Sequence, residues 1–172
     1  MNTLRPLTLL AALAAALATP AAAEESYDPN IDPAQFTTAI THPLFTMPVG
    51  KTMVFKAKSE DGEERIEIRI RGETREIMGV ETLVYNDRVF VAGQLVEETS
   101  DYIAQDKSGN VWYFGEAVDN YEAGKLKDHH GAWIAGIDGA KPGIWMTAKQ
   151  EVGREYRQEY YKGEAEDWAK VV

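Results

Sequence analysis

The sequence predicts a mainly β fold: an antiparallel meander in a single domain, forming a curled sheet or a partly open barrel. Ile66, Ile68 and Ile70 alternate with charged residues, which is the period of two expected of a half-buried strand. Glycine-centred turn signals run from Gly62 to Gly124, with their glycines 17, 14, 16 and 15 residues apart. No internal stretch keeps helical apolar spacing over three turns, so the pattern favours sheet over helix.

The first 23 residues have the pattern of a secretory signal peptide. Arg5 precedes the apolar stretch Leu7–Ala18, and small residues ending at Ala23 follow it. Twelve apolar residues are too few to cross a bilayer, which takes about 20, and no cysteine follows for lipid attachment. We therefore expect export to the periplasm or the exterior, with cleavage after Ala23 and no transmembrane segment in the mature form.

Two further regions follow the predicted signal peptide. Residues 24–48 contain four prolines and little periodicity, which predicts an extended lead-in across the body of the protein. Residues 49–172 form the predicted β domain, with strands of roughly ten residues or more between short turns. A short helix is expected over Glu164–Val171. The lead-in and the C-terminal segment should close part of the opening of the sheet.

Composition excludes several classes of function. Only Arg5 leaves with the signal peptide, so the mature chain carries 18 − 1 = 17 basic and 28 acidic residues, a net charge of −11. That sign argues against nucleic acid and against anionic membrane surfaces as partners. The chain has no cysteine, which rules out disulfides and thiol chemistry. No cofactor is expected.

The stretch "QDKSGNVWYFGE" (105–116) invites comparison with a calcium loop. Counted from Asp106, the twelfth position is Ala117 rather than the bidentate Glu that such a loop needs, and both flanks are strand-like. The pattern instead predicts a tight β-hairpin in which Gly109 takes positive φ. Alternation after the turn separates two aromatic faces, so neither face should be freely solvated: Trp112 and Phe114 on one, Val111 and Tyr113 on the other.

Three segments resemble the signature of a group of secreted bacterial proteins of unknown function: "YIAQDKSGNVWYFGE" (102–116), "GAWIAGIDGAKPGIWM" (131–146) and "YRQEYYKGEAEDWAKVV" (156–172). The resemblance runs from Pro43 to the end, departs at Met53 and Phe55, and implies no catalytic residue. Members of the group continue for several more strands. The resemblance therefore implies an open sheet edge around Tyr160–Val172, where a second copy or a partner could add a strand.

A metal-assisted enzyme is the alternative function. Asp128, His129 and His130 are consecutive ligand-type residues, and the carboxylates of residues 164–167 could assist. Adjacent side chains of a strand point to opposite faces, however, so the two histidines should not bind one ion together. We expect no tight transition-metal site here.

Aromatic residues give the leading functional prediction. The chain has 4 Trp, 8 Tyr and 5 Phe, and rings with one polar atom suit the wall of an apolar pocket with a few hydrogen-bonding groups. The competing interpretation is that they fill the core. The sequence favours a non-enzymatic binding protein for an apolar or amphipathic ligand, with these candidate residues: Trp112, Phe114, Trp133, Trp145 and Tyr160.

Overall fold

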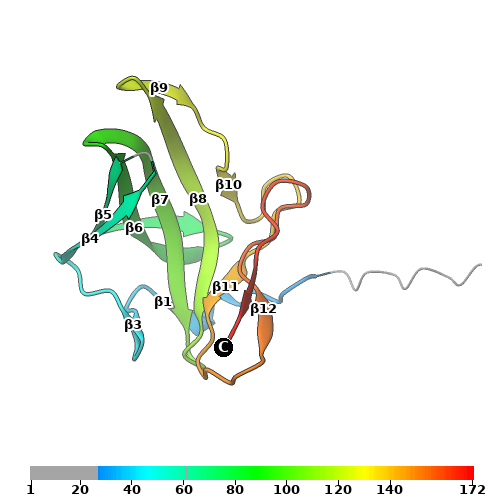
Figure 1. Cartoon of the computed structure of the whole chain (residues 1–172). Coiled ribbons are helices and arrows are strands. Elements are labelled where there is room, and N and C mark those ends of the chain that lie inside the picture. Colours follow the sequence, from blue (N-terminus) through cyan, green and yellow to red (C-terminus); the bar gives the residue numbers. More distant parts are fainter. Residues whose placement is uncertain (1–26, 61) are drawn as a thin grey trace, which may run out of the picture.

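The computed structural model describes residues 27–60 and 62–172, and the predicted signal peptide lies outside them. The predicted class is confirmed: the fold is an antiparallel meander with a nine-stranded main sheet that curls without closing on itself (Figure 1). The described residues contain no α-helix and one 3₁₀ turn, η1 (Pro33–Gln35).

Four long strands build the meander, and their lengths agree with the sequence prediction. They are joined by tight turns at Gly79, Gly93 and Gly109, all with positive φ. The order across the sheet is β10-β8-β7-β6-β5-β4, where β10 is Trp133–Ile134 and β4 is Thr52–Ser59. The long strands are β5 (Gly62–Ile77), β6 (Val80–Val91), β7 (Gln94–Asp106) and β8 (Val111–Glu122).

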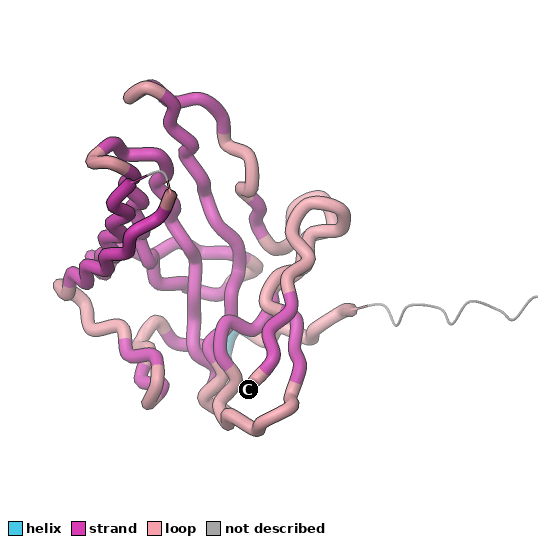
Figure 2. Tube along the Cα trace, in the orientation of Figure 1, coloured by secondary structure: helices cyan, strands magenta, loops and turns pink. Residues whose placement is uncertain are grey.

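Shorter strands extend this sheet or lie beside it (Figure 2). β4 (Thr52–Ser59) pairs with β5 at one end of the sheet, and β1 (Phe36–Thr37) pairs with β7. β9 (Lys125–Asp128), β10 (Trp133–Ile134) and β11 (Gly143–Met146) all pair with β8. Two separate ribbons complete the fold: β2 (Thr41–His42) with β3 (Phe45–Thr46), and β12 (Glu155–Arg157) with β13 (Trp168–Lys170).

The predicted helix over Glu164–Val171 is wrong. Ala165 instead closes a turn by donating its N–H to the carbonyl of Tyr161 (2.8 Å), and β13 follows. The ring of Trp168 lies 4.6 Å from the guanidinium of Arg157 on the paired strand. Pairing with β12 therefore overrides the weak local helix preference of an eight-residue segment.

One outer edge of the main sheet falls at β4. Within the described chain, β4 pairs only with β5, whereas the segment Tyr160–Val172 pairs with β12 and forms isolated bridges at Tyr160 and Tyr161. The resemblance implied an open edge at the C-terminal segment, where β13 pairs only with β12 within the described chain. The β4 edge is a second candidate, at the end of the main sheet.

Aromatic residues pack on both faces of β8, as the sequence predicted. On one face Phe36 meets the rings of Trp112 and Phe114 edge-on, at 6.0 and 5.4 Å between ring centroids. On the other face Tyr113 meets Trp133 at 5.2 Å and Trp145 at 4.7 Å. Both faces of the sheet are therefore covered here, and the core is built on each side of it.

The start of the described chain contacts both the loop before β11 and the C-terminal segment. The hydroxyl of Tyr27 donates to the carbonyl of Pro142 (2.8 Å), and Lys141 pairs with Asp28 (2.8 Å). Arg157 lies against the rings of Tyr27, Tyr160 and Trp168, at 5.7, 4.7 and 4.6 Å from their centroids. This contact holds the C-terminal segment beside β8 and β11, where it borders the pocket described next.

Candidate functional site: an acidic pocket with an aromatic wall

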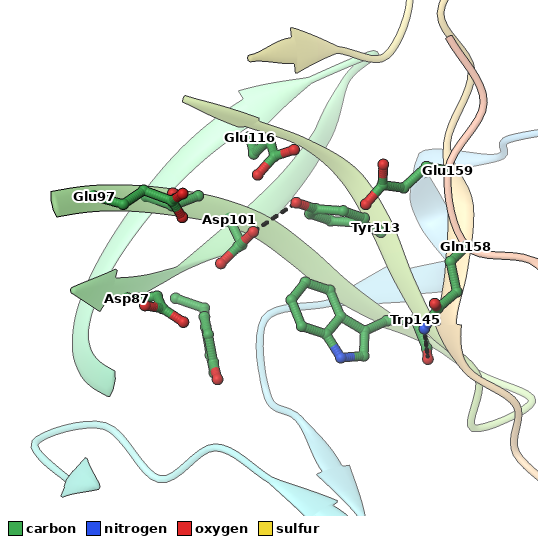
Figure 3. A pocket seen from close by; sticks show the side chains of 10 residues that line it. Asp87, Glu97, Asp101, Tyr113, Glu116, Trp145, Gln158 and Glu159 are labelled. Carbon is green, nitrogen blue, oxygen red and sulfur yellow. Dashed lines mark hydrogen bonds between the residues drawn. The ribbon is translucent and has the colours of Figure 1, made fainter. Parts of the chain in front are cut away.

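A cavity of about 330 Å³ opens between the curled sheet and the C-terminal segment. Strands β6, β7 and β8 supply one side, β11 supplies Trp145, and the loop after β12 supplies the other side (Figure 3). Of the ten described residues that line it, five are acidic and none is Lys, Arg or His. They are Tyr85, Asp87, Glu97, Thr99, Asp101, Tyr113, Glu116, Trp145, Gln158 and Glu159.

A bulge in β8 places two of these side chains together. Asp101 pairs with Glu116 and Ile103 pairs with Tyr113, so three steps along β8 oppose two along β7. Strict alternation would put Tyr113 and Glu116 on opposite faces. The extra residue is accommodated by Gly115, whose φ is +126° and where a Cβ would lie 2.3 Å from the carbonyl oxygen of Trp133. Only glycine fits this position, and Tyr113 and Glu116 both reach the pocket as a result.

Three rings form the wall, with Trp145 packed against both of the others. The ring centroid of Trp145 lies 5.5 Å from that of Tyr85 and 4.7 Å from that of Tyr113. Phe45, on the β2–β3 ribbon, stacks behind Trp145 at 5.7 Å and behind Tyr85 at 6.3 Å. Neighbours on several elements thus fix the rings, which makes the wall preformed.

Asp101 is the deepest carboxyl group. It is 5% exposed, its Oδ1 accepts a 2.6 Å hydrogen bond from the Tyr113 hydroxyl, and its Oδ2 receives none from the described residues. Burial raises the pKa of Asp101 well above its usual range, and the acidic neighbours Glu116 and Asp87 add to the effect. The same burial, reinforced by Asp101, raises the pKa of Tyr113.

The remaining carboxyl groups form no ion pair with a basic side chain of the described residues. Oδ1 of Asp87 is buried and has no hydrogen-bond donor in the described part of the chain; burial and then Glu97 raise the pKa of Asp87 to about 6. Burial raises the pKa of Glu116 to about 7, against the opposing effect of polar contacts with Tyr113 and Trp133. Glu159, brought in by the loop after β12, also has a pKa raised to about 7, by burial and then by Glu116.

The opposite face of the same strands is built differently. There Glu67 pairs with Arg65, with Arg69 (2.7 Å) and with Arg88 (3.8 Å). No pocket carboxylate forms an ion pair with a described residue. Clustered buried carboxylates without a counter-charge disfavour ionisation and cost folding free energy. In these strands, the clustered carboxylates without basic partners lie on the pocket face.

The candidate ligand-binding aromatic residues lie in different parts of the structure, and only some of them line a cavity. Trp145 lines the pocket, and Trp133 lines a neighbouring cavity of about 270 Å³ while contacting Tyr113. Phe114 is fully buried in the core. Trp112 donates its indole N–H to Oδ2 of Asp106 (2.8 Å) at the hairpin, and Tyr160 packs on Tyr27 and Arg157.

The side chains of the candidate metal ligands already contact neighbouring polar groups of the protein. Oδ1 of Asp128 accepts from Asn120 (2.8 Å) and from the N–H of His130 (3.1 Å), and the His130 bond is the main reason that the pKa of Asp128 is lowered. Nδ1 of His129 lies 2.9 Å from both the carbonyl of Val118 and a carboxylate oxygen of Asp119. Across residues 27–60 and 62–172, no three His, Cys, Asp or Glu side chains are grouped so that they could hold a metal ion.

The acidic lining residues were not predicted from the sequence. Glu97, Thr99 and Asp101 recur every second residue along β7, which is a signal of one shared face. That face looks solvent-exposed by composition, since nothing in the local pattern shows that Trp145 and residues 158–159 cover it. The bulge at Gly115 also breaks the alternation that would connect Tyr113 to Glu116.

No protein-family model, curated protein or solved structure matches this chain. The resemblance to the secreted bacterial group therefore stays a prediction. Within the described residues, no helix has both the length and the apolar composition needed to span a membrane.

Proposed function

We propose that the protein is an exported, non-enzymatic binding protein that holds a small amphipathic ligand in the acidic pocket. The supporting observation is the preformed wall of Tyr85, Tyr113 and Trp145, which faces polar groups across a cavity of about 330 Å³. That volume lies at the lower end of the range for small-molecule sites, in which a few polar groups orient a ligand against apolar walls. Export rests on the predicted signal peptide.

The test is a calorimetric binding screen of the mature protein with short-chain amphiphiles whose heads are cationic, neutral or anionic. We expect at least one class to bind with one-to-one stoichiometry. Trp145→Ala should weaken that binding about tenfold or more, since it removes a ring at the centre of the wall. Trp168→Ala is the matched control, because Trp168 is 59% exposed and does not line the pocket. Equal losses in both variants, or no binding of any class, would contradict the proposal.

A further inference from the structure

The sheet face that carries the pocket continues into an apolar surface on β5 and β4. Residues paired across antiparallel strands share a face. Asp87 pairs with Ile68, which pairs with Met53; Val89 pairs with Ile66, which pairs with Phe55. These two rows begin at or beside the acidic pocket and end at the sheet edge. We name the accessible part of this surface the apolar strip: Met53, Phe55, Ile66 and Val89.

The apolar strip is accessible to a ligand. Phe55 is 53% exposed although it lies on the same face as the buried Ile68. Met53 and Ile66 are partly buried and pack against the core, so they form a supported surface. An apolar strip that adjoins a polar pocket offers two chemically different surfaces to one ligand.

Charge decides the head group of that ligand. Within the described chain the pocket has five carboxyl groups and no basic side chain among its lining residues. The side chain of Asp101 is buried and directed into the cavity, and no described residue donates to its Oδ2 (Figure 3). The rings of Tyr85, Tyr113 and Trp145 add the π faces that attract cations. A positive head would supply the counter-charge that the folded chain lacks there.

From this arrangement we propose, building on the proposed function, that the ligand is a cationic amphiphile. Its ammonium-type head binds among Asp87, Asp101, Glu116 and Glu159, and its alkyl chain lies along the apolar strip. The two strand spacings from β6 to β4, about 4.8 Å each, span about 10 Å, so a chain of about eight carbons covers the strip. A divalent ion fits less well, because no three ligating side chains are grouped for one in the described residues.

The experiment compares octyltrimethylammonium, octyl glucoside and octyl sulfate with the mature protein below their micelle concentrations. We expect octyltrimethylammonium to bind about tenfold or more tightly than the other two. Equal binding of octyl glucoside would overturn the cationic head while leaving the proposed function standing. Failure of all three would overturn both. Stoichiometric calcium binding that displaces octyltrimethylammonium would also overturn this inference.

Paired variants separate the site from the general attraction of an acidic protein for cations. Asp87→Asn should weaken octyltrimethylammonium binding about tenfold, with Glu159→Gln as a second variant from the covering loop. Glu122→Gln removes the same charge at an exposed position outside the pocket and should leave the affinity within about twofold. Equal effects of Asp87→Asn and Glu122→Gln would overturn the assignment of the head.

Variants at two neighbouring residues of β4 test the apolar strip. Phe55 and Val54 are 53% and 54% exposed and point to opposite faces of the strand. Phe55→Ser should weaken octyltrimethylammonium binding about fivefold and leave tetramethylammonium binding unchanged, whereas Val54→Ser should alter neither. If Val54→Ser weakens binding as much as Phe55→Ser, the chain does not lie along the strip.

Discussion

The hydroxyl of Tyr113 donates a 2.6 Å hydrogen bond to Oδ1 of Asp101, and both side chains are nearly fully buried. The bond joins β7 to β8 at the bulge and is the only hydrogen bond that the Asp101 carboxyl group accepts from the described residues. It therefore links the stability of the sheet to the chemistry of the pocket.

Replacing Tyr113 by phenylalanine removes the hydroxyl and keeps the ring. We expect Tyr113→Phe to lower the free energy of unfolding by about 1–3 kcal/mol, because a buried carboxyl oxygen loses its donor. Urea denaturation measures the change. Tyr121→Phe is the control, since Tyr121 is more exposed and its hydroxyl makes no hydrogen bond with a described residue. Similar losses in both variants would show that the Tyr113 bond contributes nothing specific.

The pocket carboxyls should make stability depend on pH. In the folded state the pKa of Glu116 rises from 4.5 to about 7, so the folded chain binds more protons than the unfolded chain between these values. Its contribution to stability therefore falls as pH rises from about 4.5 through 7, and is most unfavourable above 7. The acidic groups that act on it are Glu97, Asp101, Glu159 and Asp167, and Arg75 lines the neighbouring cavity with it.

Glu116→Gln tests this linkage, since glutamine stays neutral at every pH. We expect it to stabilise the protein by about 1–2 kcal/mol at pH 8, after a discount for solvent screening of a partly exposed group, and by little at pH 5. Thermal melts across that range provide the measurement. A variant whose stability curve runs parallel to that of the wild type would rule Glu116 out as the source.

The hairpin at Gly109 gives a third prediction. Gly109 has a φ of +94°, and a Cβ there would meet the Cβ of Ala148 at 3.3 Å. Gly109→Val should therefore destabilise the protein by about 1 kcal/mol or more. Ser108→Ala, one residue earlier without positive φ, is the control.

The wild-type melting temperature should not respond to calcium, and an increase with calcium would support the calcium-loop interpretation of this hairpin.

The segment Asp128–His130 should not hold zinc tightly. Asp128 is engaged by Asn120 and by the N–H of His130, and His129 lies against Val118 and Asp119. After dialysis against zinc-free buffer, elemental analysis should find far less than one zinc per chain. Stoichiometric zinc that disappears in His129→Ala or His130→Ala would contradict this and support the metal-assisted enzyme.

The edge at β4 gives the last prediction. The net charge of −11 for the predicted mature chain, from 17 basic and 28 acidic residues, opposes self-association at low salt, and its repulsion is screened within about 8–10 Å at physiological ionic strength. We expect light scattering to show a monomer at low salt and association as salt rises. Val54→Lys should suppress association if β4 is the contact, and Val172→Lys, with the same charge change, should not. The reverse result would place the contact at Tyr160–Val172, as the resemblance implied.

How far the sequence predicts the fold depends on whether local alternation survives. Ile66, Ile68 and Ile70 keep one phase through a regular part of β5, so their shared face was predictable. Gly109 was predictable because one tight turn needs one residue of this kind. The helix prediction for Glu164–Val171 was wrong because the structure of this segment depends on its pairing with β12, which the residues of the segment do not themselves indicate. The pocket could not be predicted for the same reason, since only the tertiary structure brings Glu159 and Trp145 close to Asp101.

The bulge at Gly115 means that the identity of this pocket is encoded by chain length as well as by residue type. Deleting Gly115 would remove the bulge and leave Tyr113 and Glu116 two positions apart, still on one face of a regularly alternating β8. Keeping a residue at this position while losing the bulge would instead move Glu116 and Val118 off the pocket face and bring Ala117 and Asp119 onto it. In evolution or in design, a substitution here that the bulge cannot accept could therefore exchange the binding chemistry of this part of the face, whereas deletion of the same residue would preserve it.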